Sequence, residues 1–400
     1  MAQDIRFEIL PGIYPSDMST DGAVIVGNDI NFETVRWTRQ SGVVNLGRGT
    51  QSLGVGAGTP DCSDDGSSVS ASILTSDGTL ITQGIWTEGV GWTEMMPPTP
   101  PDGGVIDFAL GSAWGLSGDG QHVVGLYWRP GHFDTGGAHA SIASTPGALI
   151  DLGSSGGSSR ANHANFDGSV VVGWDERPDG VWQPAVWENG LLNILSPSNA
   201  FSSADYVNPS GTMIGGNTYR PIFNYQQATI WHKNGSQWDE QVLGVLPGTV
   251  GPFGFATVHG SNEDDSMLVG YNSFSPTSVS TGFIWTAEDG MIDVKDFLSD
   301  HGITVPTEMI VLDLTAVSAD GRVMAGIGVS AHDGFSPIGF RISPACPADM
   351  NNDFSLNFLD ISVFLGAFGD NEPLADFNAD GNFNFLDVSE FLSSFSAGCP

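Results

Sequence analysis

The stretch STDGAVIVG (residues 19–27) is one of a set of related phrases, each with a short polar lead, Asp-Gly, mostly apolar residues and a small closing residue. Clear copies are SGDGQHVVG (117–125), NFDGSVVVG (165–173) and SADGRVMAG (318–326), and degenerate copies are SDDGSSVSA (63–71), NPSGTMIGG (208–216) and NEDDSMLVG (262–270). The first glycine position of the phrase runs 22, 66, 120, 168, 211, 265 and 321, with Asp at 265. Seven copies at intervals of 43 to 56 residues indicate a repeat architecture.

Each copy has the same sequel, an apolar strand that usually ends in an aromatic residue. These aromatic residues are Trp37, Trp86, Trp187, Trp231, Trp285 and Phe340. A further strand follows a short turn, as in GVVNLG (42–47), and another strand precedes Asp-Gly, which we expect to form the tight turn between the first two strands. Four strands per unit of roughly 50 residues predict an all-β fold, a seven-bladed β-propeller over residues 1–343.

The two ends of the repeat region predict how such a ring would close. The seventh unit ends after its third strand, IGFRIS (338–343), whereas RFEIL (6–10) precedes the first unit and belongs to no other. We therefore expect the N-terminal strand to complete the last blade and leave no unpaired edge. A sandwich or a β-helix would not predict this missing strand.

The units resemble HAF-type extracellular repeats, which are rich in Asp-Gly, Gly and Trp at these offsets, over about residues 5–342. The tripeptide that gives those repeats their name is not evident in this sequence. The resemblance implies secretion and a repeat architecture, and it implies no reaction.

Composition narrows the classes of partner. Asp and Glu outnumber Lys and Arg by 46 to 12, for a net charge of -34, so nucleic acid and anionic membranes would be repelled and divalent cations attracted. No run approaches the roughly 18 to 20 apolar residues of a membrane span. A length of 400 residues allows one large and one small domain. We expect a soluble chain with a core, because 40% of its residues are hydrophobic and its mean hydropathy is -0.01.

Three cysteines bear on the compartment. Cys346 and Cys399 bracket the C-terminal segment, and Cys62 stands alone. Interpreted as a disulfide clasp, the bracketing pair predicts an oxidising, extracellular or cell-surface location, with a signal peptide already removed and Met1 added. The alternative is three unrelated buried thiols.

One face of the predicted propeller carries a candidate ligand site. Loops between second and third strands contain Arg-Pro three times, with nearby aromatic residues. The candidate residues are Trp128, Arg129, Trp174, Arg177, Trp182, Tyr219, Arg220 and Tyr225. Aromatic faces stack on sugars and arginine pairs with carboxylates or sulfates, so an acidic polysaccharide fits this set. Alternatively, Arg-Pro stiffens the loops and each arginine pairs with a local acidic residue. No catalytic residue is named, because esterase, zinc-protease and phosphate-loop motifs are absent.

The C-terminal segment repeats another pattern, DMNNDFSLNFLD (349–360) and DFNADGNFNFLD (376–387). A calcium loop needs oxygen ligands at positions 1, 3, 5, 7, 9 and 12. The first loop offers Asp349, Asn351, Asp353, Ser355 (through its carbonyl), Asn357 and Asp360, and the second offers Asp376, Asn378, Asp380, Asn382 (through its carbonyl), Asn384 and Asp387. The spacing predicts two bound calcium ions.

Asp at position 12, a predicted helix after each loop and a 27-residue interval resemble dockerin modules, in the Cys-bracketed version of planctomycete secreted proteins, over about residues 345–400. We place the boundary of this small α-helical domain at residues 344–400. Position 6 is Phe354 in the first loop, where glycine is usual, and Gly381 in the second. Positions 10 and 11, where cohesin contacts are often Ser-Thr, are Phe-Leu in both loops (358–359 and 385–386). These pairs could be core, or they could face a cohesin-like or different receptor.

These features favour a secreted, non-catalytic binding or scaffold protein whose propeller recognises a ligand and whose dockerin-like module docks to a cell-surface or assembly partner. One alternative is an extracellular polysaccharide-degrading enzyme, a glycoside hydrolase or lyase, carried by the module. Another is a self-assembling subunit, with the module of one copy engaging the propeller of the next, head to tail.

Overall fold

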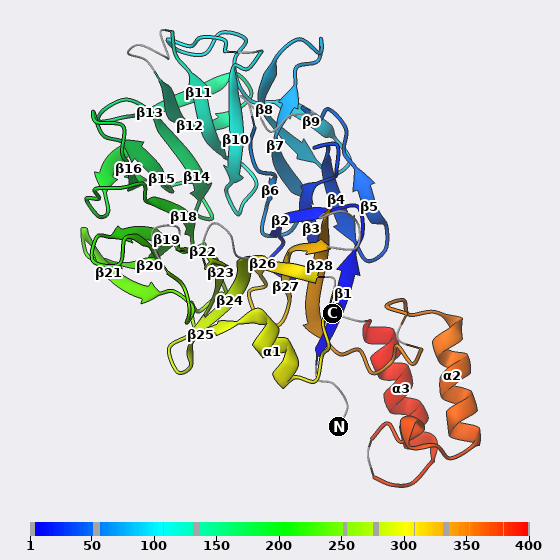
Figure 1. Cartoon of the computed structure of the whole chain (residues 1–400). Helices are drawn as coiled ribbons and strands as arrows, with labels where there is room; N and C mark the ends of the chain where they lie inside the picture. The colour runs from blue at the N-terminus through cyan, green and yellow to red at the C-terminus, as the bar shows by residue number, and fades with distance from the viewer. Residues whose placement is uncertain are drawn as a thin grey trace.

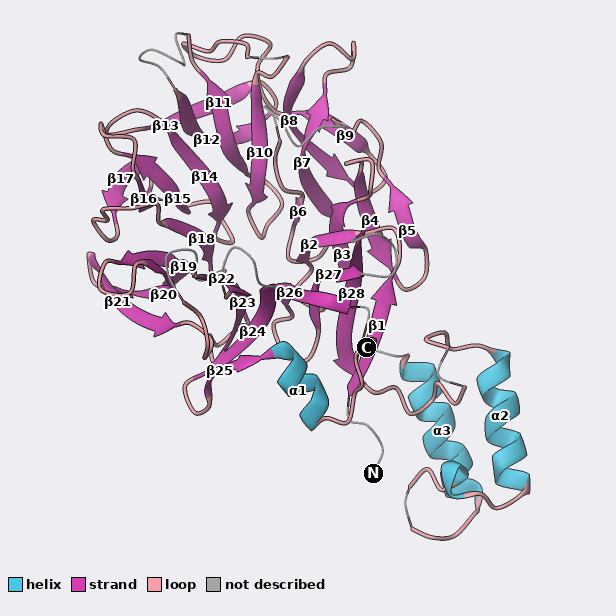
Figure 2. Ribbon diagram, viewed as in Figure 1, coloured by secondary structure: helices cyan, strands magenta, loops and turns pink. Residues whose placement is uncertain are grey.

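The structure is a computed structural model. It describes residues 5–50, 57–106, 108–130, 137–250, 254–274, 280–307, 309–330, 336–351, 353–378 and 380–398. Strands make up about half of the described chain, and two helices form a separate lobe at its C-terminal end (Figure 2). In this part of the chain, no helix is both long and apolar enough to cross a membrane.

The strands form antiparallel four-stranded units, the blades of a β-propeller (Figure 1). Two of these units are joined into one eight-stranded sheet by a single parallel pairing between Gln226 and Phe255. Each blade runs outward from its first strand to its fourth. The fold class predicted from the repeats, mostly β with propeller blades, is confirmed.

The strand bounds follow the repeats. The first strands are β2 (Tyr14–Met18), β6 (Asp61–Cys62), β10 (Gly111–Leu116), β14 (Ser159–Ala164), β18 (Ser203–Val207), β22 (Phe255–Ser261) and β26 (Met309–Val317). The second strands are β3 (Val24–Asn28), β7 (Ser68–Leu74), β11 (Val123–Trp128), β15 (Val170–Glu176), β19 (Met213–Arg220), β23 (Met267–Ser273) and β27 (Met324–Ser330). The third strands are β4 (Thr34–Thr38), β8 (Ile81–Thr87), β12 (Ala138–Thr145), β16 (Trp182–Glu188), β20 (Tyr225–Asn234), β24 (Ser280–Thr286) and β28 (Ser336–Pro344). The outer strands are β5 (Gly42–Asn45), β9 (Gly91–Glu94), β13 (Ala148–Gly153), β17 (Leu191–Ile194), β21 (Gln237–Gly244), β25 (Gly290–Asp293) and β1 (Ile5–Leu10).

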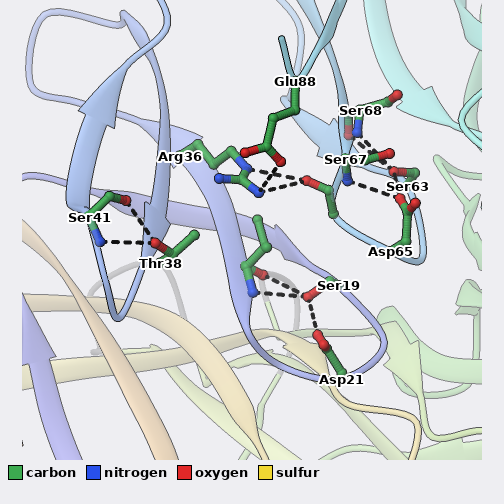
Figure 3. A network of polar contacts seen from close by, with 12 residues as sticks. Ser19, Asp21, Arg36, Thr38, Ser41, Ser63, Asp65, Ser67, Ser68 and Glu88 are labelled. Carbon is green, nitrogen blue, oxygen red and sulfur yellow. Dashed lines mark hydrogen bonds and ion pairs between the residues drawn. The ribbon is translucent and has the colours of Figure 1, made fainter. Parts of the chain in front are cut away.

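The Asp-Gly phrase forms the turn between first and second strands, as predicted. Ser19 Oγ donates to Asp21 Oδ1 at 2.7 Å, and the Val24 amide donates to Ser19 Oγ at 2.9 Å (Figure 3). Gly22 has φ 71°, and a Cβ there would lie 2.8 Å from Val323 Cβ of the last repeat. Glycine is therefore favoured both by the turn and by contact with the neighbouring blade.

The first repeat touches both the second and the last. The Thr20 amide donates to the Asp64 carbonyl at 2.9 Å, and the Ala319 amide donates to the Thr20 carbonyl at 2.7 Å. Strand β1 pairs antiparallel with β28, with Leu10 opposite Gly339. The N-terminal strand therefore supplies the fourth strand of the sheet that holds the last repeat.

The closing glycine of the phrase allows first and second strands to approach closely. A Cβ at Gly173 would lie 1.9 Å from the Arg160 carbonyl oxygen, beside a β-bulge between Ala161 and His163. In the degenerate copy Ala71 takes this position, and its partner β6 is only two residues long. The phrase thus encodes both the turn and the approach of the innermost strand.

Helices occur after the β-strands of the sixth and seventh repeats. Helix α1 (Val294–Asp300) follows β25, and the C-terminal lobe contains α2 (Phe358–Gly369), the 3-10 turn η1 (Pro373–Ala375) and α3 (Phe385–Ala397). Phe364 and Phe391 stack with ring centres 4.1 Å apart at the centre of a hydrophobic cluster drawn only from residues 346–395. The C-terminal lobe therefore has a core of its own.

Candidate functional site

The first acidic loop of the C-terminal lobe gathers three carboxylates. One oxygen from each of Asp349, Asp353 and Asp360 lies within 4.8 Å of the others. Asp360 accepts the Asn357 amide at 2.9 Å and the Asn351 amide at 3.3 Å, while Asp353 remains exposed. The chain therefore wraps around the carboxylates of positions 1, 5 and 12, as the predicted spacing requires.

The second loop repeats this arrangement. Asp387 accepts the Asn384 amide at 2.8 Å and the Phe377 amide at 2.9 Å, and Asp376 accepts the amides of Asp380 and Gly381 at 3.1 and 2.9 Å. The two loops thus use equivalent residues in equivalent bonds.

The donor set of both loops consists of oxygen atoms, with no sulfur or imidazole among the predicted ligands, which fits a hard cation such as calcium. The side chains of Asn357 and Asn384 cap α2 and α3, accepting the amides of Leu359 and Leu386 at 2.8 and 2.9 Å. Position 9 is therefore engaged by the helix, which suits a ligand that reaches the ion through water. Asn351, Ser355, Asn378 and Asn382 lie in the described loops at the remaining positions.

The first loop is also fastened to the propeller. Phe354, at position 6, has φ 63°, a left-handed conformation that costs a side-chain-bearing residue about 1–2 kcal/mol. The Arg6 guanidinium lies 5.0 Å from the Phe354 ring centre, and Arg39 Nη1 donates to the Phe354 carbonyl at 2.7 Å. Arg6 also forms a buried ion pair with Asp349. Phe354 thus adopts a backbone conformation that favours glycine, while its ring and its carbonyl contact arginines of the propeller.

The Phe-Leu pairs at positions 10 and 11 are exposed in both loops. Phe358 is 73% exposed and Leu359 57%, and Phe385 is 76% exposed and Leu386 59%. Their alternative role as core residues is wrong, because the core of the lobe is built from Phe364, Phe391 and their neighbours. Both pairs are available for contact with another molecule.

The cysteines lie in different surroundings. Cys62 is a free, buried thiol whose pKa is raised well above its ordinary value, first by burial and then by the charge of Asp17. Cys346 is buried in the C-terminal lobe. The predicted bond to Cys399 involves a residue outside the described part of the chain, so the clasp stays a prediction.

The Arg-Pro arginines contact groups close to their own loops. Arg177 pairs with Asp179 at 2.7 Å, and Arg220 pairs with Glu240 at 2.9 Å. Arg129 Nη1 lies 3.0 Å from His139 Nε2, beside half-buried Trp128. Arg177 and Arg220 therefore pair with local acidic residues, as the alternative interpretation of the Arg-Pro loops expects.

Four of the five predicted aromatic residues form two groups. Trp174 and Trp182 stack with ring centres 4.3 Å apart, so each ring covers one face of the other. Tyr225 stacks on Phe223 at 5.7 Å, and the Tyr219 hydroxyl donates to Asn224 at 2.8 Å. Part of the aromatic surface predicted for a sugar is therefore used within the protein.

The innermost strands surround two cavities of about 300 and 370 Å³. Both cavities are lined by Asp17, His163, Tyr206, His259 and Thr315. A β-bulge occurs at the same point of β2, β10, β14, β18, β22 and β26, and such bulges redirect a side chain. Residues at the bulge position line the larger cavity: Ser16, Trp114, Asn162, Asp205, His259 and Thr315.

Sequence reasoning missed these cavity-lining residues, although the repeat contains a signal for them. Each bulge residue stands six positions before the first glycine position of its phrase, and Pro60 holds that position in the second repeat. The residue type varies from Ser to Trp to His, so a search for similar residues passes over it. The fixed offset would have found all seven.

Two residues of the larger cavity have shifted pKa values. Burial first, and then the charge of Asp17, raise the pKa of Asp61 well above its usual range. Burial lowers the pKa of His163, whose Nε2 lies 3.7 Å from Asp61 Oδ2. Burial therefore favours the uncharged form of both Asp61 and His163, an acid and a base of the kind that can exchange protons with a ligand.

Arg160 lies in the larger cavity on the face that carries the Arg-Pro loops. Its guanidinium lies 3.7 Å from the Trp114 ring centre, and its Nε donates to Asn162 Oδ1 at 2.7 Å. Burial lowers the Arg160 pKa to about 10, with Asp205 acting in the opposite direction. This arginine, which sequence analysis did not name, brings a cation and an aromatic ring together at the cavity.

Comparison with known proteins finds similarity in fold alone. No family model matches the chain, and no curated protein matches it. Oligogalacturonate lyase from Vibrio parahaemolyticus is similar at TM-score 0.50 and 13% identity, covering 86% of this chain and 92% of the lyase. The β-propeller domain of the Trilobed protease from Pyrococcus furiosus has TM-score 0.47 and 10% identity, covering 82% of this chain and 93% of that domain.

TolB from Acinetobacter baumannii has TM-score 0.43 and 10% identity, covering 71% of this chain. The chain spans only 62% of the length of that TolB. At such identities the similarities concern the fold alone. The chain is a β-propeller protein with a helical C-terminal lobe.

Proposed function

We propose that the protein is a secreted binding or scaffold protein, a seven-bladed propeller closed by β1 that carries a dockerin-like docking module at residues 344–400. The observation that carries the proposal is the pair of equivalent acidic loops, of which the first holds three carboxylate oxygens within 4.8 Å of one another. Each loop would hold one calcium ion through the six predicted positions, and binding would help to fold the module.

The propeller part of the proposal is supported by contacts at both ends of the repeats. The β1–β28 pairing and the hydrogen bonds of the first turn to the second and last turns are what a closed ring of seven blades requires. The resemblance to secreted repeat proteins favours an extracellular or cell-surface location.

The exposed Phe-Leu pairs support docking through the module. Two equivalent apolar pairs, each at the start of a helix, present the same contact surface twice. Because the pairs are apolar, their receptor would be a cell-surface or assembly protein with a hydrophobic groove, either cohesin-like or of another type. Head-to-tail docking on a second copy is the self-assembly alternative.

Calcium-dependent capture tests this function. The full chain, immobilised with calcium, is expected to retain a receptor from the surface fraction of its native culture and to release it in chelator. Phe385→Ser with Leu386→Ser would reduce capture, whereas Asp370→Asn, an exposed change in the module outside both loops, would not. Capture that ignores calcium and both Phe-Leu pairs contradicts the proposal, and elution of the chain itself identifies self-assembly.

Cleavage of a polysaccharide is a second candidate, favoured by the acidic and imidazole side chains of Asp17, Asp61 and His163 at the larger central cavity. Asp61 could donate a proton and Asp17 or His163 accept one from a bound sugar. Release of reducing ends or unsaturated uronates from acidic polysaccharides, abolished by Asp17→Asn, would support an enzyme. No release by a chain that binds the same polysaccharide would exclude it.

A further inference from the structure

One position of the repeat is aliphatic in five copies and arginine in two. It lies on the third strand, opposite the residue that precedes the closing small residue of each phrase. The aliphatic residues are Ile85, Ile142, Val186, Ile230 and Ile284, all buried, and the arginines are Arg36 and Arg341. These two belong to the first and last repeats, which lie next to each other. The fold therefore does not require arginine at this position.

The buried position of Arg341 is unfavourable for a charged side chain. It is 1% exposed, and its Nε and Nη1 have no hydrogen-bond partner in the described part of the protein. Its Nη2 makes only a long bond, 3.4 Å, to the Gly22 carbonyl. A buried guanidinium without an ion pair of its own destabilises a protein, and the other repeats carry aliphatic residues at this position instead.

Arg341 lines a cavity of about 440 Å³ between the last and first repeats. Its charged lining consists of Arg36, Arg39, Arg341 and Glu88, in a chain of net charge -34. Arg36 donates to the Gly66 carbonyl and to Glu88 (Figure 3), and Arg39 pairs with Glu8 at 3.0 Å. Glu8 also acts on Arg341 but is bonded to Arg39, so the three arginines face two carboxylates and one positive charge is in excess.

The rest of the lining is suited to hydroxyl groups. Thr38, Gln40 and Ser41 line the same cavity, and Figure 3 shows Thr38 bonded to Ser41 at the tip of the neighbouring hairpin. Burial, followed by the charge of Arg39, lowers the Arg341 pKa to about 10, and the opposing charge of Glu8 does not offset them. An anion would relieve both effects.

We propose that this cavity binds an acidic saccharide, with its carboxylate or sulfate group paired to the Arg341 guanidinium and its hydroxyls facing Thr38, Gln40 and Ser41. The inference rests on the proposed function in one respect, that the propeller of a secreted binding protein recognises a ligand. It does not depend on calcium or on the docking module. Carboxylate and sulfate share the chemistry that an arginine fork recognises.

Binding is measured on the full chain by calorimetry and by thermal shift with glucuronate, glucose 6-sulfate, inorganic sulfate, an acidic peptide and glucose. The decisive variant is Arg341→Ile, which installs the residue that other repeats carry. Arg322→Gln, at an exposed arginine of the same repeat, is the control for the loss of one charge.

We expect one or both acidic sugars to bind, glucose to bind much more weakly, and Arg341→Ile to weaken the acidic sugar by about tenfold or more, because charge-assisted pairs are the strong ones. Arg341→Ile should melt at the same or a higher temperature, while Arg322→Gln should bind normally. Binding that Arg341→Ile leaves intact overturns the inference, as does binding of sulfate or the peptide without any acidic sugar. Normal calcium binding by a chain that binds none of these anions overturns the inference alone and leaves the docking function standing.

Discussion

The contact between Arg6 and the first acidic loop predicts that calcium and the propeller compete for one carboxylate. Arg6 pairs with Asp349, the residue at position 1, and the side chains are 7% and 0% exposed. Arg6→Gln keeps a polar side chain and removes the charge. In chelator, the variant would leave Asp349 buried without its counter-ion.

The magnitude follows from the burial of the pair. Removing one partner of a buried ion pair costs about 3–5 kcal/mol, because the remaining charge is uncompensated. With calcium bound, the ion faces Asp349 and we expect the cost to fall by about 2 kcal/mol. Coupling is reciprocal, so the same variant should bind calcium at its first loop roughly 30-fold more tightly than the unaltered chain.

Denaturant unfolding with calcium and with chelator measures both states, and calorimetry measures the affinity of the first loop. Arg39→Gln is the matched control, because Arg39 contacts the backbone of Phe354 and the side chain of Glu8 but no predicted ligand side chain. Its cost should be small and independent of calcium. If Arg6→Gln lowers the free energy of unfolding by the same amount in calcium and in chelator, the ion pair is not linked to calcium binding and the reasoning is wrong.

Three further predictions concern the propeller. Gly173→Ala should lower the free energy of unfolding by about 3 kcal/mol, because its Cβ would lie 1.9 Å from a backbone oxygen. Its control, Gly366→Ala, lies in open space on α2 and should raise that free energy by about 1 kcal/mol. Equal denaturation midpoints for the two variants would refute this prediction. Burial raises the Asp313 pKa to about 7, so the stability that this group contributes is full below about pH 4 and is lost as pH rises through about 7. Asp313→Asn should therefore flatten the fall of the denaturation midpoint with pH across that window. Curves of midpoint against pH that run parallel for the variant and the unaltered chain would count against this prediction. Asp61→Asn imitates the protonated acid and should change stability by less than about 1 kcal/mol at neutral pH, while a large loss would mean that Asp61 is ionised.

The repeats predicted the blades because both the turn and the strand approach depend on local residues. Gly22 and Gly173 meet short-range demands that sequence displays directly. The spare strand at residues 6–10 also signalled its pairing, since a missing fourth strand leaves an edge that needs a partner.

Long-range contacts account for what the sequence could not supply. The cavity residues Asp17, Asp61 and His163 come from three different repeats, and the raised pKa of Asp61 depends on burial that only the assembled blades produce. Likewise, Phe354 looks like a defect in a calcium loop until Arg6, 348 positions earlier, is found against its ring. The local ion pairs of Arg177 and Arg220, and the burial of Arg341 without an ion pair of its own, likewise depend on contacts that the sequence does not display.

Calcium titration of the full chain by calorimetry tests the central claim most directly. We predict two ions per chain, one of them lost in Asp360→Ala and the other in Asp387→Ala, with helical signal of the module falling in chelator. A chain that binds no calcium, or that keeps both ions in the double variant, would contradict the assignment of residues 349–360 and 376–387 as the loops of a calcium-folded docking module.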